Sequence, residues 1–148
     1  MVYVWEFEFV QEDGYVDAVP CGSFGEGTFG DDLDDAVASA ADWLSAVVDD
    51  HLMGRRELPP MDFGFKPEHG GRIIAVAVSR SLGDIPAMTA ADAARELGVS
   101  SARVAQLVKA GLLDSWKDGS RRMVSRDSVE ARKVEVPKAG RPKAPAAA

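Results

Sequence analysis

Apolar and charged side chains alternate with a period of two along residues 2–10, which is the pattern of a β-strand with one buried face. The side chains predicted to face the core are aromatic: Tyr3, Trp5, Phe7 and Phe9. Residues 11–14 end in a glycine and predict a hairpin turn, so residues 15–19 are expected to return as a second strand. Glycines recur in residues 21–30, where 25–29 have room for a short third strand. An antiparallel sheet is therefore expected to begin the fold.

The apolar spacing changes to that of a helix after Asp32. One stripe of this helix, which is expected to extend to about residue 52, consists of Leu33, Val37, Ala40, Leu44 and Val47. Asp31, Asp32, Asp34 and Asp35 crowd the first turn, where carboxylates cap free amide groups. Residues 72–79 are rich in β-branched and small apolar side chains and predict a fully buried strand. The order strand, strand, strand, helix, strand predicts an α+β fold for the first half.

Charge is divided unevenly between the two halves of the chain. The net charge is −7, yet residues 1–86 hold 17 acidic and 5 basic side chains (−12), whereas residues 87–148 hold 12 basic and 7 acidic ones (+5). Two partners of opposite charge explain this division, and so does attraction between the halves. The connector with Gly83 and Pro86 marks the boundary. We expect a domain at 1–80, a linker at 81–88, a second domain at 89–135 and a flexible tail at 136–148.

Residues 88–132 carry helix starts and stops in the order that a helix-turn-helix requires. Thr89 and Ser100 are placed to cap two helices, and Gly98 and Gly111 to end them. The predicted inward positions are Ala91, Ala94 and Leu97 on the first helix and Val104, Leu107 and Val108 on the second. Residues 114–125 predict a small hairpin with its turn at residues 117–120, a candidate wing. Ser125 is expected to cap a final helix that contains Val129.

The outward side of the second predicted helix has short side chains near its start and polar ones beyond, which suits a helix that enters a major groove. Basic side chains in the wing would add phosphate contacts. The expected DNA-binding residues are Ser100, Ser101, Arg103, Gln106 and Lys109 on the helix and Lys117, Arg121 and Arg122 in the wing. Residues 89–113, with the later Arg126-Asp127-Ser128-Val129, resemble the helix-turn-helix of excisionases and MerR-type regulators. The alternative is a small helical domain that packs on the first half and binds no DNA.

Four short motifs of the first half suggest a second resemblance: Gly14-Tyr15-Val16, Val19-Pro20, Leu33-Asp34-Asp35-Ala36 and Leu58-Pro59. With these motifs, residues 3–79 resemble the HicB-type antitoxin domain. The turn after the second strand departs from the family, since Pro20-Cys21-Gly22-Ser23-Phe24-Gly25, with an apparent extra residue, stands where the family usually has Pro-Asp-Leu-Pro-Gly-Cys. The resemblance implies a small, partly RNase H-like fold that covers the active site of an RNA-cleaving toxin. The expected toxin-binding residues are Tyr15, Asp17, Asp31 and Asp34.

Two functions follow from these features. The first is an antitoxin of a type II HicAB-like toxin-antitoxin system, which neutralises an mRNA-cleaving HicA-like toxin and represses its own operon by binding operator DNA. The second is a stand-alone helix-turn-helix transcriptional regulator whose first domain senses or oligomerises. Operators of such proteins are usually paired half-sites, so we expect a homodimer or a higher homo-oligomer.

An enzyme is the least favoured class. Asp17, Asp31, Asp32 and Asp34 could hold Mg²⁺ for phosphodiester hydrolysis, but helix capping explains three of them and no nucleophile or base accompanies them. His51 and His69 suit surface or turn roles. We therefore expect no catalysis, no cofactor and no metal site.

Residues 73–78 form the longest apolar run, far short of the roughly 20 residues that a membrane helix needs. The N-terminus has no basic region of the kind that precedes a signal sequence. Cys21 is the only cysteine, without Cys or His neighbours at metal-ligand spacing, and suits a small buried or turn position. We expect a cytoplasmic protein without a membrane partner. Within the tail, Gly140-Arg141-Pro142 is similar to the core of a minor-groove AT-hook, which a solvated chain end also explains.

Overall fold

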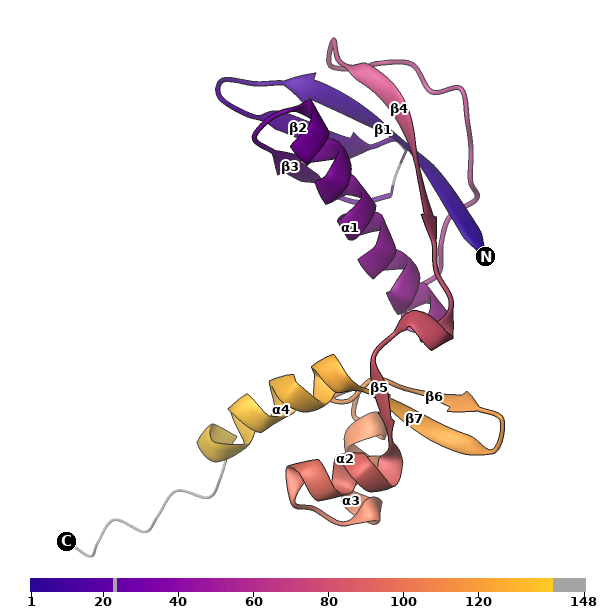
Figure 1. Cartoon of the computed structure of the whole chain (residues 1–148), viewed down its shortest axis with the longest axis vertical. Coiled ribbons are helices and arrows are strands. Elements are labelled where there is room, and N and C mark those ends of the chain that lie inside the picture. The colour runs from indigo at the N-terminus through magenta and orange to yellow at the C-terminus, as the bar shows by residue number, and fades with distance from the viewer. Residues whose placement is uncertain (23, 140–148) are drawn as a thin grey trace, which may run out of the picture. The chain divides into compact units, whose positions relative to one another are not determined.

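The computed structural model describes residues 1–22 and 24–139, so the AT-hook-like residues 140–142 lie outside the described part of the chain. The chain divides into two compact units, Met1–Asp84 and Ile85–Ala148, whose elements are labelled in Figure 1. The predicted α+β fold class is confirmed. The connector expected at 81–88 consists of ordered pieces of both units: the 3₁₀ turn η1 (Leu82–Asp84) ends the first, and Ala87 and Met88 belong to a strand of the second.

The first unit is built on a four-stranded antiparallel sheet with the spatial order β3-β2-β1-β4. Its strands are β1 (Val2–Gln11), β2 (Val16–Pro20), β3 (Thr28–Gly30) and β4 (Arg72–Ser79), and the helix α1 (Leu33–Leu52) lies between β3 and β4 in sequence. The predicted hairpin is confirmed, because β1 pairs with β2 from Phe7 opposite Pro20 to Gln11 opposite Val16. The short third strand is also present, at the end of its predicted range.

Helix α1 covers one face of this sheet, and the core lies between them. Its buried side chains are Ala36, Ala40, Leu44, Val47 and Val48. They meet the aromatic face of β1, where Trp5, Phe7 and Phe9 are at most 5% exposed, as the alternation predicted. Trp5 stacks on Phe24 at 3.8 Å between ring centroids and donates its indole N–H to the carbonyl oxygen of Cys21. Aromatic rings of β1 and Phe24 thus pack against the aliphatic side chains of α1 in this core.

The first turn of α1 is capped by carboxylates, as predicted, but by only two of the four that the sequence suggested. Asp32 is the N-cap and accepts the backbone N–H of Asp35, while the Asp35 carboxylate accepts the backbone N–H of Asp31. Asp31 and Asp34 do not act as caps, since the reciprocal pair Asp32 and Asp35 accepts the backbone N–H groups of Asp35 and Asp31. Gly30 sits directly before this turn, where a Cβ would collide with the backbone nitrogen of Ala36.

Strand β4 was predicted to be fully buried, and this prediction was wrong. The strand lies at the edge of the sheet and pairs only with β1. Val76 is buried against α1, whereas Ala75 and Ala77 are exposed on the opposite face. A run of small and β-branched side chains has the same composition whether one face or both are covered, so the sequence could not separate the two cases.

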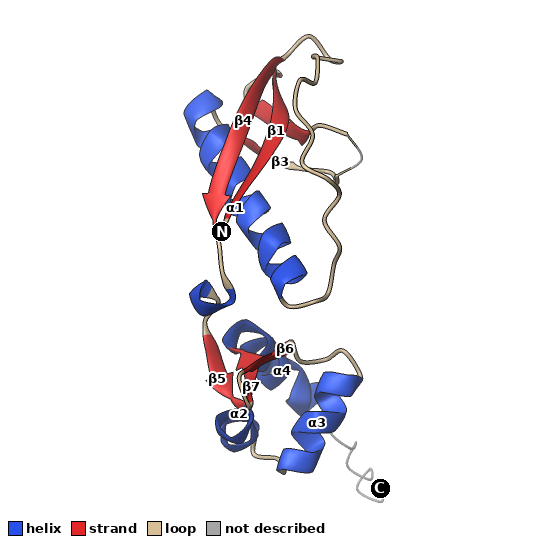
Figure 2. Ribbon diagram, turned by 90° about the vertical axis from the view of Figure 1, so that its right-hand side faces the viewer, coloured by secondary structure: helices blue, strands red, loops and turns tan. Residues whose placement is uncertain are grey.

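The long loop 54–71 returns across the face of the sheet that α1 leaves open (Figure 2). It is held there by two carboxylates of β1 that were expected to face solvent. Glu6 accepts the backbone N–H of Phe65 at 2.9 Å. Glu8 is only 4% exposed and accepts the backbone N–H groups of Glu68, His69 and Gly71. Burial raises the pKa of Glu8, but the three hydrogen bonds outweigh it and the pKa lies below its ordinary value.

The second unit combines helices with a three-stranded antiparallel sheet of order β5-β7-β6. Its elements are β5 (Ala87–Thr89), α2 (Ala90–Leu97), α3 (Ser101–Lys109), β6 (Ser115–Asp118), β7 (Arg121–Ser125) and α4 (Arg126–Ala139). The strand β5 was missed, because a three-residue strand, two residues of which lie in the expected connector, carries no periodic signal. Its pairing with β7 ties the start of α2 to the hairpin.

A second core holds this unit together. It consists of Met88, Ala93, Ala94, Val104, Leu107, Leu113, Val124 and Val129, all buried. The predicted inward positions of α3 and Val129 of α4 are confirmed, but Ala91 is exposed and Ala93 takes its place. Ser125 accepts the backbone N–H of Ser128 and thus caps α4, as predicted. The helix continues to Ala139, so the flexible tail does not begin at residue 136.

Candidate functional site

The helix pair α2 and α3 is defined by local backbone signals. Thr89 accepts the backbone N–H of Asp92 at the start of α2, and Gly98 ends this helix in the left-handed region at φ 66°. Ser100 then accepts the backbone N–H of Arg103 and starts α3. Gly111, at φ 76°, follows the end of α3. Two helices separated by a three-residue turn, with a second helix that presents one face to solvent, form a helix-turn-helix.

The five residues that the sequence nominated on α3 are all exposed: Ser100, Ser101, Arg103, Gln106 and Lys109. Val104 and Leu107 fasten the opposite side of the helix to the core. Arg103 donates from Nη1 to Oε1 of Gln106 at 3.2 Å, so these two polar side chains are held together on this face. Arginine and glutamine are the side chains that pair bidentately with guanine and adenine edges in the major groove. The Ser100 hydroxyl accepts the cap bond and still has its own hydrogen to donate.

The hairpin β6–β7 projects away from the helices of its unit (Figure 1). Asp118 pairs with Arg121, so the loop contains only Gly119 and Ser120, one residue further along than the centre of the predicted turn. Gly119 takes the positive φ of 64° that a two-residue hairpin loop requires. The remaining nominated residues, Lys117, Arg121 and Arg122, are exposed on this hairpin. The predicted wing is therefore present.

The positive side chains of the second unit fall into two groups. Three on α2 and α4 face carboxylates: Arg95 pairs with Asp92, Lys133 with Glu96 (2.7 Å) and Glu130 (3.2 Å), and Arg132 with Glu135 (3.7 Å). Arg126, at the start of α4, has no ion pair among the described residues. The hydrogen bond from Lys133 lowers the pKa of Glu96, and the bonds to Glu96 and Glu130 raise the pKa of Lys133. Within the described part of the chain, no ion pair engages the cations of α3 and the hairpin: Arg103, Lys109, Lys117, Arg121 and Arg122. Positive charge is thus left unneutralised on these two elements.

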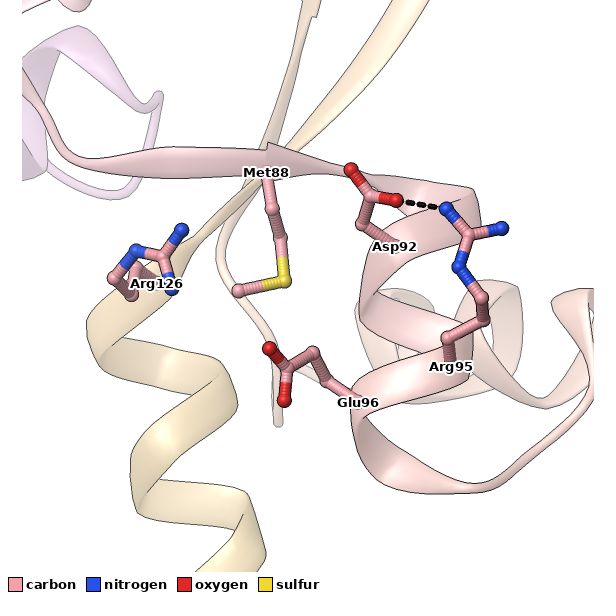
Figure 3. Close-up of a pocket in the computed structure, with 5 residues that line it drawn as sticks. All are labelled: Met88, Asp92, Arg95, Glu96 and Arg126. Carbon is pink, nitrogen blue, oxygen red and sulfur yellow. Dashed lines mark hydrogen bonds and ion pairs between the residues drawn. The ribbon is translucent and has the colours of Figure 1, made fainter.

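The exposed side of α2 has a different character. A shallow pocket of about 290 Å³ is lined by Met88, Asp92, Arg95, Glu96 and Arg126. Figure 3 shows Arg95 engaged by Asp92 and the carboxylate of Glu96 on the same side as the start of α4. Two carboxylates and two arginines line this pocket, so both signs of charge are present there. The unpaired cations place the candidate nucleic-acid interface on α3 and the hairpin.

Comparison with protein families agrees with this geometry. Residues 87–133 match a family described as a helix-turn-helix domain. The second unit contains a helix-turn-helix domain. This match covers β5 through most of α4 and supports a DNA-binding regulator. No curated protein and no solved structure matches the chain.

The residues nominated for toxin binding lie at one end of the first unit. Tyr15 immediately precedes β2, Asp17 lies within β2, Asp31 follows β3, and Asp34 lies in the first turn of α1. Tyr15 is 38% exposed, and its ring contacts Phe29 at 5.9 Å between centroids. Phe29, which sequence reasoning did not nominate, is 60% exposed. The sequence placed Phe29 in a short predicted strand. It did not indicate which face of that strand would stay exposed to solvent.

The remaining residues considered from the sequence are the aspartates of a possible metal site, His51 and Cys21. In the described residues, no three His, Cys, Asp or Glu side chains are grouped so as to hold a metal ion, so Asp17, Asp31, Asp32 and Asp34 are not brought together as such a group. His51 Nδ1 lies 2.9 Å from the carbonyl oxygen of Arg56. Cys21 is buried, and burial together with nearby carboxylates raises its pKa to about 11. None of the helices described has the length and apolar character that crossing a membrane requires.

Proposed function

We propose that this protein is an autoregulating antitoxin of a HicAB-like system. Its second unit would bind operator DNA, and its acidic first unit would bind and mask a basic, mRNA-cleaving HicA-like toxin. Both roles are binding roles and need no catalytic residue. The observation that carries the DNA-binding role is the contrast between Arg95, Lys133 and Arg132 of α2 and α4, which are ion-paired, and the five exposed cations of α3 and the hairpin, which are not.

In the proposed complex, α3 enters the major groove and the hairpin contacts the adjacent backbone. Arg103 and Gln106 would contact base edges and so carry sequence preference. Lys117, Arg121 and Arg122 would contact phosphates and release counterions, which makes affinity strongly dependent on salt. Arg122 already donates to the Ser115 hydroxyl at 2.9 Å, which orients its guanidinium along the hairpin.

Support for the protein-binding role comes from charge and from the resemblance of residues 3–79 to the HicB-type domain. The first unit holds 17 acidic and 5 basic residues. A toxin that acts on RNA has a positively charged face, and complementary charge speeds its association with an acidic partner and penalises other partners. Paired half-sites in an operator would be read by a homodimer or higher homo-oligomer.

The second candidate is a stand-alone transcriptional regulator without a toxin. It is favoured by the extent of the family match, which covers 87–133 and leaves the first unit outside. Co-expression with the small basic protein encoded by an adjacent reading frame separates the two. A stable complex that abolishes RNA cleavage by that protein supports the antitoxin. DNA binding without such a partner supports the regulator.

The DNA-binding role is tested by mobility shifts on the upstream region of the gene. Arg103→Ala should weaken binding by about 1–3 kcal/mol with loss of sequence preference. Arg121→Ala should weaken all sequences alike and reduce the salt slope by about one. Arg95→Ala is the matched control, because it removes the same charge from α2, where Asp92 already pairs with it. Equal effects of all three substitutions would refute the assignment of the interface to α3 and the hairpin.

A further inference from the structure

An aromatic pair is exposed at the β2–β3 end of the first unit. The rings of Tyr15 and Phe29 meet edge to face, with 5.9 Å between centroids and 76° between planes. Phe29 lies directly opposite Asp17 in the antiparallel register, so their side chains lie on the same face of the sheet. The ring of Phe29 thus has an aromatic neighbour on one side and a carboxylate on another, and 60% of the residue is accessible to solvent.

The folding of the first unit does not account for this exposure. Helix α1 covers the opposite face, where the neighbouring residues Val16 and Ala18 are buried. The loop 54–71 covers the open face at Glu6 and Glu8, further along the sheet. The end formed by β2 and β3 is left without a cover among the described residues. Exposed aromatic side chains surrounded by polar groups are enriched in protein interfaces.

The charge around this pair specifies the kind of partner. The first 54 residues contain 13 carboxylates and no Lys or Arg. The nearest of these to the aromatic pair in sequence and register include Asp17, Asp31 and Asp34, and no hydrogen bond or ion pair of the described residues engages their carboxylates. Capping of α1 uses Asp32 and Asp35 instead. A cationic side chain that approached Phe29 would therefore meet both an open aromatic ring and unneutralised carboxylates.

We propose that Tyr15 and Phe29, together with Asp17, Asp31 and Asp34, form the anchoring patch for an arginine or lysine on the RNA-binding face of the toxin. This inference rests on the proposed function and adds its residue-level site. Phe29 supplies the contact area of the anchor, and Tyr15 orients its ring. Asp17 pairs with the cation, while Asp31 and Asp34 attract it from a distance. The partner is a basic protein rather than a nucleic acid, since phosphate would be repelled by every carboxylate of the patch.

The test measures binding of the full-length chain to the basic protein encoded by the adjacent reading frame, by titration calorimetry and stopped-flow kinetics. Phe29→Ala should weaken binding at least about tenfold, because it removes a central aromatic anchor. Phe63→Ala is the matched control, since Phe63 is also 60% exposed in the first unit but lies in the loop 54–71. Its affinity should stay within about twofold of the wild type. Phe29→Tyr keeps the ring and should restore most of the affinity.

The carboxylates of the patch are tested separately, through the kinetics and affinity of binding. Asp31→Asn with Asp34→Asn should slow association and reduce its salt dependence with little change in dissociation, because distant charges act mainly on the rate of encounter. Asp17→Lys should weaken binding more than tenfold, about as much as loss of a central contact. Asp17→Lys also tests the patch if Phe29→Ala lowers the melting temperature, since Asp17 lies outside the core.

The outcomes separate this inference from the function on which it rests. If the wild-type chain binds no such protein, the antitoxin proposal fails and the patch has no partner. If the wild type binds but Phe29→Ala and Asp17→Lys match Phe63→Ala, the toxin docks elsewhere and the patch is refuted while the antitoxin proposal stands. Selective loss of affinity in the first two variants supports both.

Discussion

The buried carboxylate of Glu8 offers a quantitative test of how the first unit is held together. Its Oε1 accepts the backbone N–H of Glu68 at 2.9 Å, and its Oε2 accepts those of His69 and Gly71 at 2.9 and 2.8 Å. In Glu8→Gln the side chain keeps its shape but exchanges one oxygen for an NH₂ group. The amide oxygen can retain at most the two donors that share Oε2. The NH₂ group then faces the N–H of Glu68 without an acceptor.

The expected cost follows from these contacts. At least one hydrogen bond to a charged group is lost, worth about 1.5–3 kcal/mol, and a poorly solvated N–H is left unsatisfied. The retained bonds also weaken because the acceptor is now neutral. Together these effects should lower the free energy of unfolding by about 2–4 kcal/mol. For a unit of this size the melting temperature should fall on the order of 10–20 °C.

Two measurements check this value. Thermal unfolding reports the loss of stability, and amide hydrogen exchange of Glu68, His69 and Gly71 reports whether the loop is released. Glu6→Gln is the matched control, because Glu6 accepts only the N–H of Phe65 and its amide oxygen can keep that bond. Its cost should stay below about 1 kcal/mol. If Glu8→Gln is no less stable than Glu6→Gln, or if its three amides stay protected, the argument from buried charge is wrong.

Three further predictions concern pH, glycine geometry and thiol reactivity. The pKa of Glu8 is held below its ordinary value of 4.5, so its contribution to stability is present above about pH 4.5 and is lost as pH falls through the lower native value; acid titrations should show this loss in the wild type and not in Glu8→Gln. Gly98→Ala should lower the free energy of unfolding by about 1–2 kcal/mol from its positive φ alone, since a Cβ meets nothing within 4 Å. Gly30→Ala should lower it by about 3 kcal/mol or more, because α1 must shift. Urea unfolding would contradict this prediction if Gly98→Ala were the less stable of the two. Cys21, with a pKa of about 11, should react with a disulfide reagent at pH 8 only after unfolding, and fast reaction of the native protein would refute its burial.

The elements with strong local signals were predictable. The strict alternation of β1, the helical stripe of α1 and the caps of α2 and α3 are each specified by residues close together in the chain. The wing could be predicted from Asp118-Gly119, because an Asp-Gly pair between two short strands is a typical signal of a tight hairpin turn. The exposed face of α3 followed from the same periodicity, because the apolar side of a short helix defines its polar side.

Features that depend on distant segments were not predictable. The composition of β4 is compatible with a central or an edge strand, and its place beside β1 alone was decided by the whole sheet. Alternation assigned Glu8 to solvent, but a loop some 60 residues away in the chain covers it. The three residues of β5 became a strand only because β7 was available to pair with them.

The sequence by itself determined where charge lies along the chain and which helix of the second unit carries the candidate DNA-binding residues. These properties are local, because periodicity, caps and turns act within a few residues. Only the tertiary structure decided which charges are neutralised and which aromatic rings stay uncovered. Lys133 reaches Glu96 across 37 positions, and Phe29 stays exposed because α1 and the loop 54–71 cover other parts of the sheet. Pairing and burial are properties of surfaces brought together by folding, and no short stretch of sequence contains them.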